Sequence, residues 1–134
     1  MAKLFISYKS EQRAKASLVV DVLSSDYDVW WDQRIPFGER WRDEILREMF
    51  DSDCMLALLC RRSLESVECF AEVQHAAENQ KCVGLVLEPL SNLSPTISKL
   101  PKVSFEENDW RFGAGSSIDD VRTLLKQVTT GSVQ

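Results

Sequence analysis

The feature that most constrains this chain is an unbroken apolar run near its middle. Residues 53–60, DCMLALLC, place seven apolar residues in a row. A run of this kind is typical of a central parallel strand that helices cover on both faces. Because neighbouring parallel strands are usually joined by a crossover helix, the run predicts an α/β protein.

Predicted strands and helices alternate on both sides of this run. Strands are predicted at residues 3–8, 27–32, 82–87 and 102–105, and helices at residues 11–24, 39–51, 68–79 and 118–128. Residues 61–67 are predicted to be a loop, and residues 88–102, with three prolines, an irregular crossing whose helix is short or missing. This order predicts a flavodoxin-like, three-layer α/β fold, in which a five-stranded, mainly parallel sheet of order 2-1-3-4-5 carries helices on both faces.

Length and composition favour one domain without a metal site. The 134 residues predict a domain at residues 1–128 and a disordered tail or linker at residues 129–134. The net charge of −5 argues against nucleic acid or an anionic membrane as the main partner. No signal peptide or membrane span is visible, and one histidine with four cysteines forms no zinc pattern. Cys54, Cys60 and Cys82 lie in apolar runs, and such buried thiols indicate a reducing cytoplasm.

The predicted topology directs attention to one acidic stripe. Glu68, Glu72 and His75 share one side of the helix at residues 68–79, and the like charges of the two glutamates tend to raise the pKa of one of them. By itself such a stripe is usually a solvated surface. A sheet of order 2-1-3-4-5, however, binds ligands where its winding reverses, at the carboxyl ends of strands 1 and 3. Residues 8–10 and 61–72 would line that place, so the stripe becomes a candidate for chemistry.

Several enzyme classes that share this plan lack their sequence signatures here. The chain contains no GxGxxG dinucleotide loop, no GxxxxGK[ST] phosphate loop and no GxSxG nucleophile motif. The end of strand 1 reads Ser7-Tyr8, without the acidic residues of a two-component receiver. These absences leave the acidic stripe as the leading candidate site.

Four stretches, taken together, resemble a TIR domain of the kind common in bacterial defence proteins. They are KLFISYKS, VWWDQRIPFGERW, DCMLALLCRRSLES and ECFAEVQHA. In order, they match the first strand and its loop, the second strand with the BB loop of the family, the third strand, and the helix that bears the catalytic glutamate. Each stretch alone is weakly specific, but their combination in this order is fairly specific.

The resemblance implies an NAD⁺ glycohydrolase that takes NAD⁺ as its substrate and needs no other cofactor. Such enzymes cut the nicotinamide–ribose bond and release ADP-ribose or a cyclic form of it. Glu72 matches the catalytic glutamate. Substrate-binding roles are implied for Tyr8, Lys9, Trp31, Asp32, Arg34, Trp41, Ser66 and Glu68, and an assembly role for the loop residues Ile35, Pro36, Phe37 and Gly38.

Glu68 departs from the family pattern. Many relatives have a tryptophan four residues before the catalytic glutamate, where this chain has Glu68. Stacking on the substrate would then fall to Trp31, Trp41 or Phe70. Alternatively, Glu68 itself contributes to the site or pairs with a neighbouring arginine.

Residue type alone leaves other roles open for several of these side chains. Trp31 and Trp41 also suit the protein core, and Lys9 also suits a solvated loop. Asp32 and Arg34 could simply order their loop through hydrogen bonds.

The resemblance also implies partners and leaves a second function open. TIR domains self-associate, and activity often requires that the BB loop of one subunit complete the site of its neighbour. A sensor or oligomerisation domain C-terminal to this segment would fit that pattern. The alternative to an enzyme is a non-catalytic TIR scaffold that signals by homotypic assembly.

Overall fold

A computed structural model describes residues 1–31, 38–105 and 116–130, without the side chains of residues 38–42, 68, 116–118 and 130. The elements, in chain order, are β1 (Lys3–Ser7), the 3₁₀ turn η1 (Ser10–Gln12), α1 (Arg13–Leu23), β2 (Asp28–Trp30), α2 (Gly38–Asp51), β3 (Cys54–Leu59), α3 (Arg61–Glu65), α4 (Val67–Glu78), β4 (Cys82–Val86), α5 (Pro95–Ser98), β5 (Lys102–Ser104) and α7 (Ser116–Thr130). Within these residues, no helix is both long and apolar enough to cross a membrane.

The five strands form one parallel sheet of order β2-β1-β3-β4-β5, as the sequence predicts. Leu4 of β1 pairs with Val29 of β2 on one side and with Cys54 of β3 on the other. The winding therefore reverses between β1 and β3, and their carboxyl ends lie side by side.

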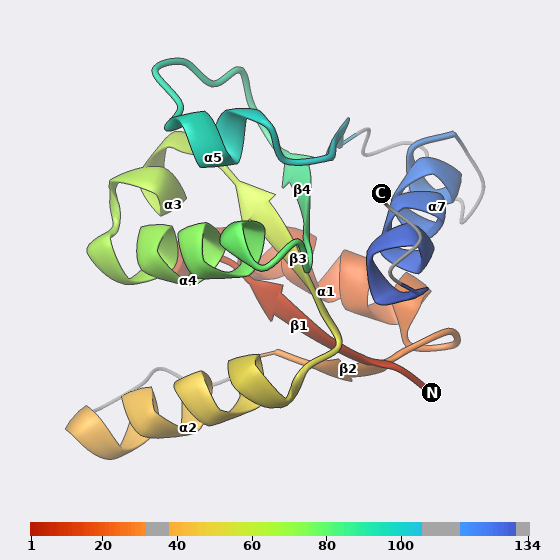
Figure 1. Cartoon of the computed structure of the whole chain (residues 1–134), viewed down its shortest axis with the longest axis horizontal. Helices are drawn as coiled ribbons and strands as arrows, with labels where there is room; N and C mark the ends of the chain where they lie inside the picture. Colours follow the sequence, from red (N-terminus) through yellow and green to blue (C-terminus); the bar gives the residue numbers. More distant parts are fainter. Residues whose placement is uncertain (32–37, 106–115, 131–134) are drawn as a thin grey trace.

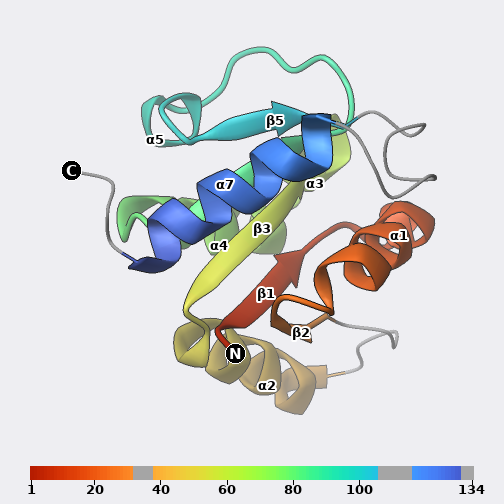
Figure 2. The same cartoon turned by 90° about the vertical axis from the view of Figure 1, so that its right-hand side faces the viewer.

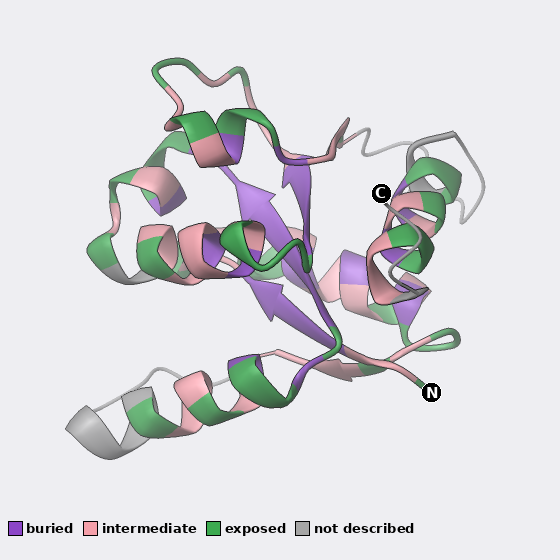
Figure 3. Ribbon diagram, viewed as in Figure 1, coloured by how far each residue is buried: buried purple, intermediate pink, exposed green. Residues whose placement is uncertain are grey.

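Helices cover both faces of this sheet and form the predicted three layers. Figure 1 shows α1 and α7 on one face and α2, α4 and α5 on the other, and Figure 2 looks onto the α1 and α7 side. Every residue of β3 is buried (Figure 3), because its alternate side chains enter two separate apolar clusters. Leu56 and Leu58 pack toward α1 and α7, whereas Met55, Ala57 and Leu59 pack toward α4 and α5.

The residues before α4 differ from the predicted loop, because residues 61–65 form the short helix α3. Its cap explains the difference. The Ser63 N–H donates to Cys60 Sγ at 3.4 Å, and the Cys60 N–H donates to Ser63 Oγ at 3.0 Å. This reciprocal pair satisfies backbone donors at the helix start, and cysteine is not a residue type from which sequence rules predict a cap.

At the other end of the chain, α7 extends to Thr130. It therefore includes Thr129 and Thr130, which the sequence places in the predicted tail. The Thr129 hydroxyl donates to the Leu125 carbonyl at 2.6 Å, one turn back in the helix. Residues 131–134 lie outside the described part of the chain.

The crossing between β4 and β5, where the sequence predicts a short or missing helix, contains the short helix α5. Ser94 Oγ accepts the Ile97 N–H at 3.2 Å and so caps its start. Lys102 Nζ closes its end by donating to the carbonyls of Ile97, Ser98 and Leu100 at 3.0, 2.8 and 2.9 Å. Partial burial lowers the pKa of this ammonium group.

The predicted core cysteines are buried. Cys54, Cys60 and Cys82 are each 1% exposed. Burial raises the pKa of Cys54 to about 11 and that of Cys82 to about 12, so both remain protonated at neutral pH.

Gly84 in β4 provides a test of packing between the sheet and α5. A Cβ at this position would lie 2.7 Å from Leu59 Cδ1 and 3.2 Å from Leu100 Cδ2. We expect Gly84→Ala to lower the free energy of unfolding by about 1–3 kcal/mol, measured by urea denaturation, because the added methyl group overpacks the core. The control is Gly84→Ala in a Leu59→Val background. Because valine lacks the Cδ1 atom that lies nearest, the loss of unfolding free energy should be smaller there. An equal loss of unfolding free energy in both backgrounds would contradict a clash with Leu59.

Ser66 provides a second test, because it holds the N-cap position of α4. Its Oγ accepts the Cys69 N–H at 3.4 Å. Ser66→Ala should lower the free energy of unfolding by about 1 kcal/mol, whereas Ser66→Asp, which keeps an acceptor oxygen, should preserve it. If Ser66→Ala melts like the wild type, the Ser66 side chain does not stabilise α4.

Candidate functional site

The candidate site begins with a contact between the end of β1 and the middle of α4. Ser7, the last residue of β1, donates a hydrogen bond from Oγ to Glu72 Oε1 at 3.0 Å. The Ser7 side chain is buried, with 3% of the residue exposed, and Glu72 is half-buried. The carboxylate therefore lies at the carboxyl end of β1, beside the point where the sheet reverses its winding.

The apolar side of α4 sets this position. Val73 and Ala76 are 2% and 5% exposed and pack on the sheet in the cluster that contains Met55. With these residues facing the sheet, Glu72 projects toward the end of β1. Cys69, one turn earlier, approaches the same strand end, with its Sγ 4.0 Å from the Tyr8 carbonyl oxygen.

Tyr8 and Trp31 reach the same edge of the sheet from its other face. Their ring centroids are 5.9 Å apart, and both rings are half-buried against the apolar cluster beneath α1 and α7. Trp30 points the opposite way and stacks on Phe5 with a centroid distance of 5.2 Å. The two tryptophans thus pack on opposite faces, as alternation along a strand requires.

Two other predicted site residues have defined backbone roles. Ser66 caps α4, as described above. Lys9 is half-buried at the N-cap of η1, where its carbonyl accepts the Gln12 N–H at 2.7 Å. Binding roles for these two residues stay predictions.

The remaining predicted residues are not described in full. Asp32, Arg34, Ile35, Pro36 and Phe37 lie outside the described part of the chain. Gly38 is the first residue of α2, and the backbones of Trp41 and Glu68 belong to α2 and α4 without a described side chain.

Two ion pairs border the carboxyl edge of the sheet. Arg62 Nε lies 3.6 Å from Glu11 Oε2 and links α3 to η1. Glu88 Oε2 accepts both the Arg61 N–H at 2.9 Å and Arg61 Nε at 3.0 Å, and these hydrogen bonds lower the pKa of the Glu88 carboxyl. Arg61 thus pairs with Glu88 and Arg62 with Glu11, whereas the Glu68 side chain lies outside the described part of the chain.

Sequence reasoning missed Ser7 as the partner of Glu72. The available signal was a hydroxyl that directly follows the apolar residues Leu4, Phe5 and Ile6 of the strand. A buried hydroxyl needs a hydrogen-bond partner, but the sequence does not show which side chain provides it.

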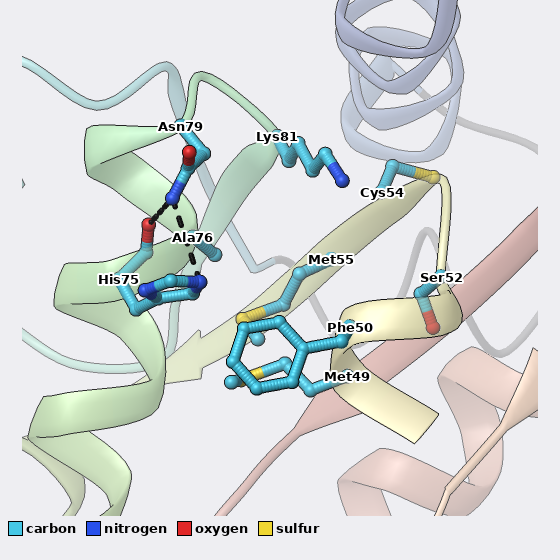
Figure 4. A pocket seen from close by; sticks show the side chains of 9 residues that line it. All are labelled: Met49, Phe50, Ser52, Cys54, Met55, His75, Ala76, Asn79 and Lys81. Carbon is cyan, nitrogen blue, oxygen red and sulfur yellow. Dashed lines mark hydrogen bonds between the residues drawn. The ribbon is translucent and has the colours of Figure 1, made fainter. Parts of the chain in front are cut away.

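His75, on the same helix as Glu72, contacts a residue of α2. Its ring meets Phe50 of α2 edge-on, with a centroid distance of 5.1 Å. Together they border a hollow of about 250 Å³ near the amino ends of β3 and β4 (Figure 4). Its lining consists of Met49, Phe50, Ser52, Cys54, Met55, His75, Ala76, Asn79 and Lys81. Glu72 is not one of these lining residues, and its contact with Ser7 lies at the carboxyl end of β1.

Comparison with solved structures identifies chains of the same fold. A 2-deoxyribosyltransferase from Bacillus psychrosaccharolyticus is 17% identical, with a TM-score of 0.61 over 92% of this chain and 96% of that one. A metazoan TIR-STING receptor from C. gigas, solved with 2′,3′-cGAMP, is 18% identical with a TM-score of 0.65 over 94% of this chain. This chain spans 39% of the receptor's length. A conserved protein from Enterococcus faecalis V583 is 14% identical, with a TM-score of 0.55 over 95% of this chain and 98% of that one.

Sequence comparison identifies the family. No curated protein matches significantly. The family model for the TIR domain, however, matches residues 4–118, which span the described strands except Lys3 of β1 and include the helix that carries Glu72. The chain therefore belongs to the TIR domain family.

Proposed function

We propose that this TIR domain cleaves NAD⁺ between nicotinamide and ribose, with Glu72 as the catalytic carboxylate. The observation that carries the proposal is the half-buried Glu72 at the carboxyl end of β1, with Oε1 bound to Ser7 at 3.0 Å. The TIR family includes enzymes of this kind, and the sheet reverses its winding beside this carboxylate.

A carboxylate at this position suits the chemistry. When the bond between C1′ and the nicotinamide nitrogen breaks, its electron pair leaves with neutral nicotinamide and positive charge develops on the ribose. A nearby negative charge stabilises this oxocarbenium-like state. Water then adds to C1′ and loses a proton, which gives ADP-ribose, whereas attack by the adenine ring gives a cyclic product. Glu72 can also accept hydrogen bonds from the ribose hydroxyls and so orient the sugar.

The remaining roles follow from the same proposal. Tyr8, Lys9 and Trp31 contact the substrate from the ends of β1 and β2, together with Asp32, Arg34, Trp41 and Glu68. The fold similarity to a 2-deoxyribosyltransferase is compatible with chemistry at a sugar carbon. Assembly through residues 35–38 brings a second TIR domain to the site, so the isolated domain has weak activity. The setting is defence signalling in the cytoplasm.

The test is nicotinamide release from NAD⁺ by concentrated protein, followed by chromatography. Glu72→Gln should lower the rate by about 10²–10³-fold, because it removes the charge that stabilises the developing cation. Glu78→Gln is the matched control, since Glu78 is an exposed acid on the same helix that accepts a hydrogen bond from Gln74 at 3.0 Å. This variant should release nicotinamide at the wild-type rate.

Two outcomes would contradict the proposal. Equal release by the wild type and Glu72→Gln would exclude Glu72 as the catalytic group. No release at any concentration, including in a fusion that forces oligomers, would instead favour the non-catalytic scaffold.

A further inference from the structure

Ser7 differs from the other buried polar side chains in what it binds. In the described part of the chain, the buried polar residues are Ser7, Ser52 and Ser63. Ser52 Oγ donates to the Glu48 carbonyl at 2.7 Å, and Ser63 Oγ donates to the Cys60 carbonyl at 2.9 Å. Both of these bonds complete backbone structure within one helical turn. Ser7, by contrast, donates to the side chain of Glu72, 65 residues later in the chain.

The two partners of this hydrogen bond sit on rigid elements. Ser7 pairs with Ala57 of β3, which is fully buried, so its backbone is fixed by the sheet. Glu72 is held by α4, whose neighbouring Val73 packs on the same sheet. A hydrogen bond between two fixed elements restricts the rotamer of the longer side chain, here that of Glu72.

The direction of the hydrogen bond also has a chemical consequence. The Ser7 hydroxyl donates and the Glu72 carboxylate oxygen accepts. Donation to a carboxylate stabilises its ionised form, which is the form able to stabilise a cationic sugar. Loss of the buried Ser7 donor would leave Glu72 Oε1 without that hydrogen bond.

We infer that Ser7 is a positioning residue for Glu72, whose hydroxyl holds Oε1 so that the carboxylate keeps one orientation at the carboxyl end of β1. This inference rests on the proposed function for its effect on the reaction, but the contact itself is independent of that function. Ser7 needs no contact with the substrate in this role. Its removal should therefore change turnover more than substrate binding.

The kinetic test compares three Ser7 variants with a matched control. Ser7→Ala and Ser7→Cys, which remove the hydroxyl, should lower kcat by about tenfold to hundredfold with little change in KM. Ser7→Thr, which keeps the hydroxyl, should retain kcat within about threefold of the wild type. Ser52→Ala removes a buried serine hydroxyl that donates to a backbone carbonyl and not to Glu72, so it should leave kcat unchanged. Thermal melting identifies any variant that does not fold, and Ser7→Cys replaces Ser7→Ala if the latter unfolds.

A spectroscopic test does not depend on activity. In protein labelled with ¹³C at the glutamate side-chain carboxyl carbon, the Glu72 resonance is the one that Glu72→Gln removes. This resonance should shift in Ser7→Ala and Ser7→Cys but remain in place in Ser52→Ala.

The two tests separate failure of this inference from failure of the proposed function. If the wild type releases no nicotinamide at any concentration, including in the fusion that forces oligomers, the proposed function fails. The shift of the Glu72 resonance then tests the role of Ser7 by itself. In an active wild type, the inference is overturned if kcat survives loss of the Ser7 hydroxyl, if KM changes in place of kcat, or if the Glu72 resonance stays unshifted.

Discussion

Complete burial of β3 is the constraint on which the rest of the structure depends. Its six residues contribute side chains alternately to two apolar clusters, one beneath α1 and α7 and one beneath α4 and α5. Because each face of the strand must be covered, the crossovers place helices on both sides of the sheet. The chain consequently winds outward in both directions from β1 and β3, and the carboxyl ends of these strands mark the place where sheets of this winding commonly bind ligands.

The candidate site is assembled from the two faces of the sheet. Glu72 comes from α4 on one face and meets the side chain of Ser7. Tyr8, the next residue, points to the other face and pairs with Trp31. The alternation of side chains along β1 thus separates a polar contact from an aromatic one at adjacent positions. A substrate at this edge would contact acid on one side and rings on the other.

The two ends of the sheet differ in chemistry. At the carboxyl end, Arg61 pairs with Glu88 and Arg62 with Glu11, and these pairs connect α3 to the end of β4 and to the start of the first helical segment. At the amino end, the hollow beside Phe50 is lined mainly by apolar side chains, with His75 and Lys81 at its border. Glu72 and His75 thus make contacts toward opposite ends of the sheet, although they lie on the same helix.

The sequence by itself determined the strand order, the buried strand and the candidacy of Glu72, because these follow from local periodicity and from the winding rule for parallel sheets. It could not determine the partner of Glu72, since Ser7 and Glu72 are 65 residues apart and meet only when α4 packs on β1. Packing of α4 beside α2 likewise decides that His75 meets Phe50. The helix at residues 61–65 was also undetermined, because it depends on a cysteine that acts as a cap. Local patterns therefore specify elements and their order, whereas the contacts between distant side chains that make a site exist only in the packed structure.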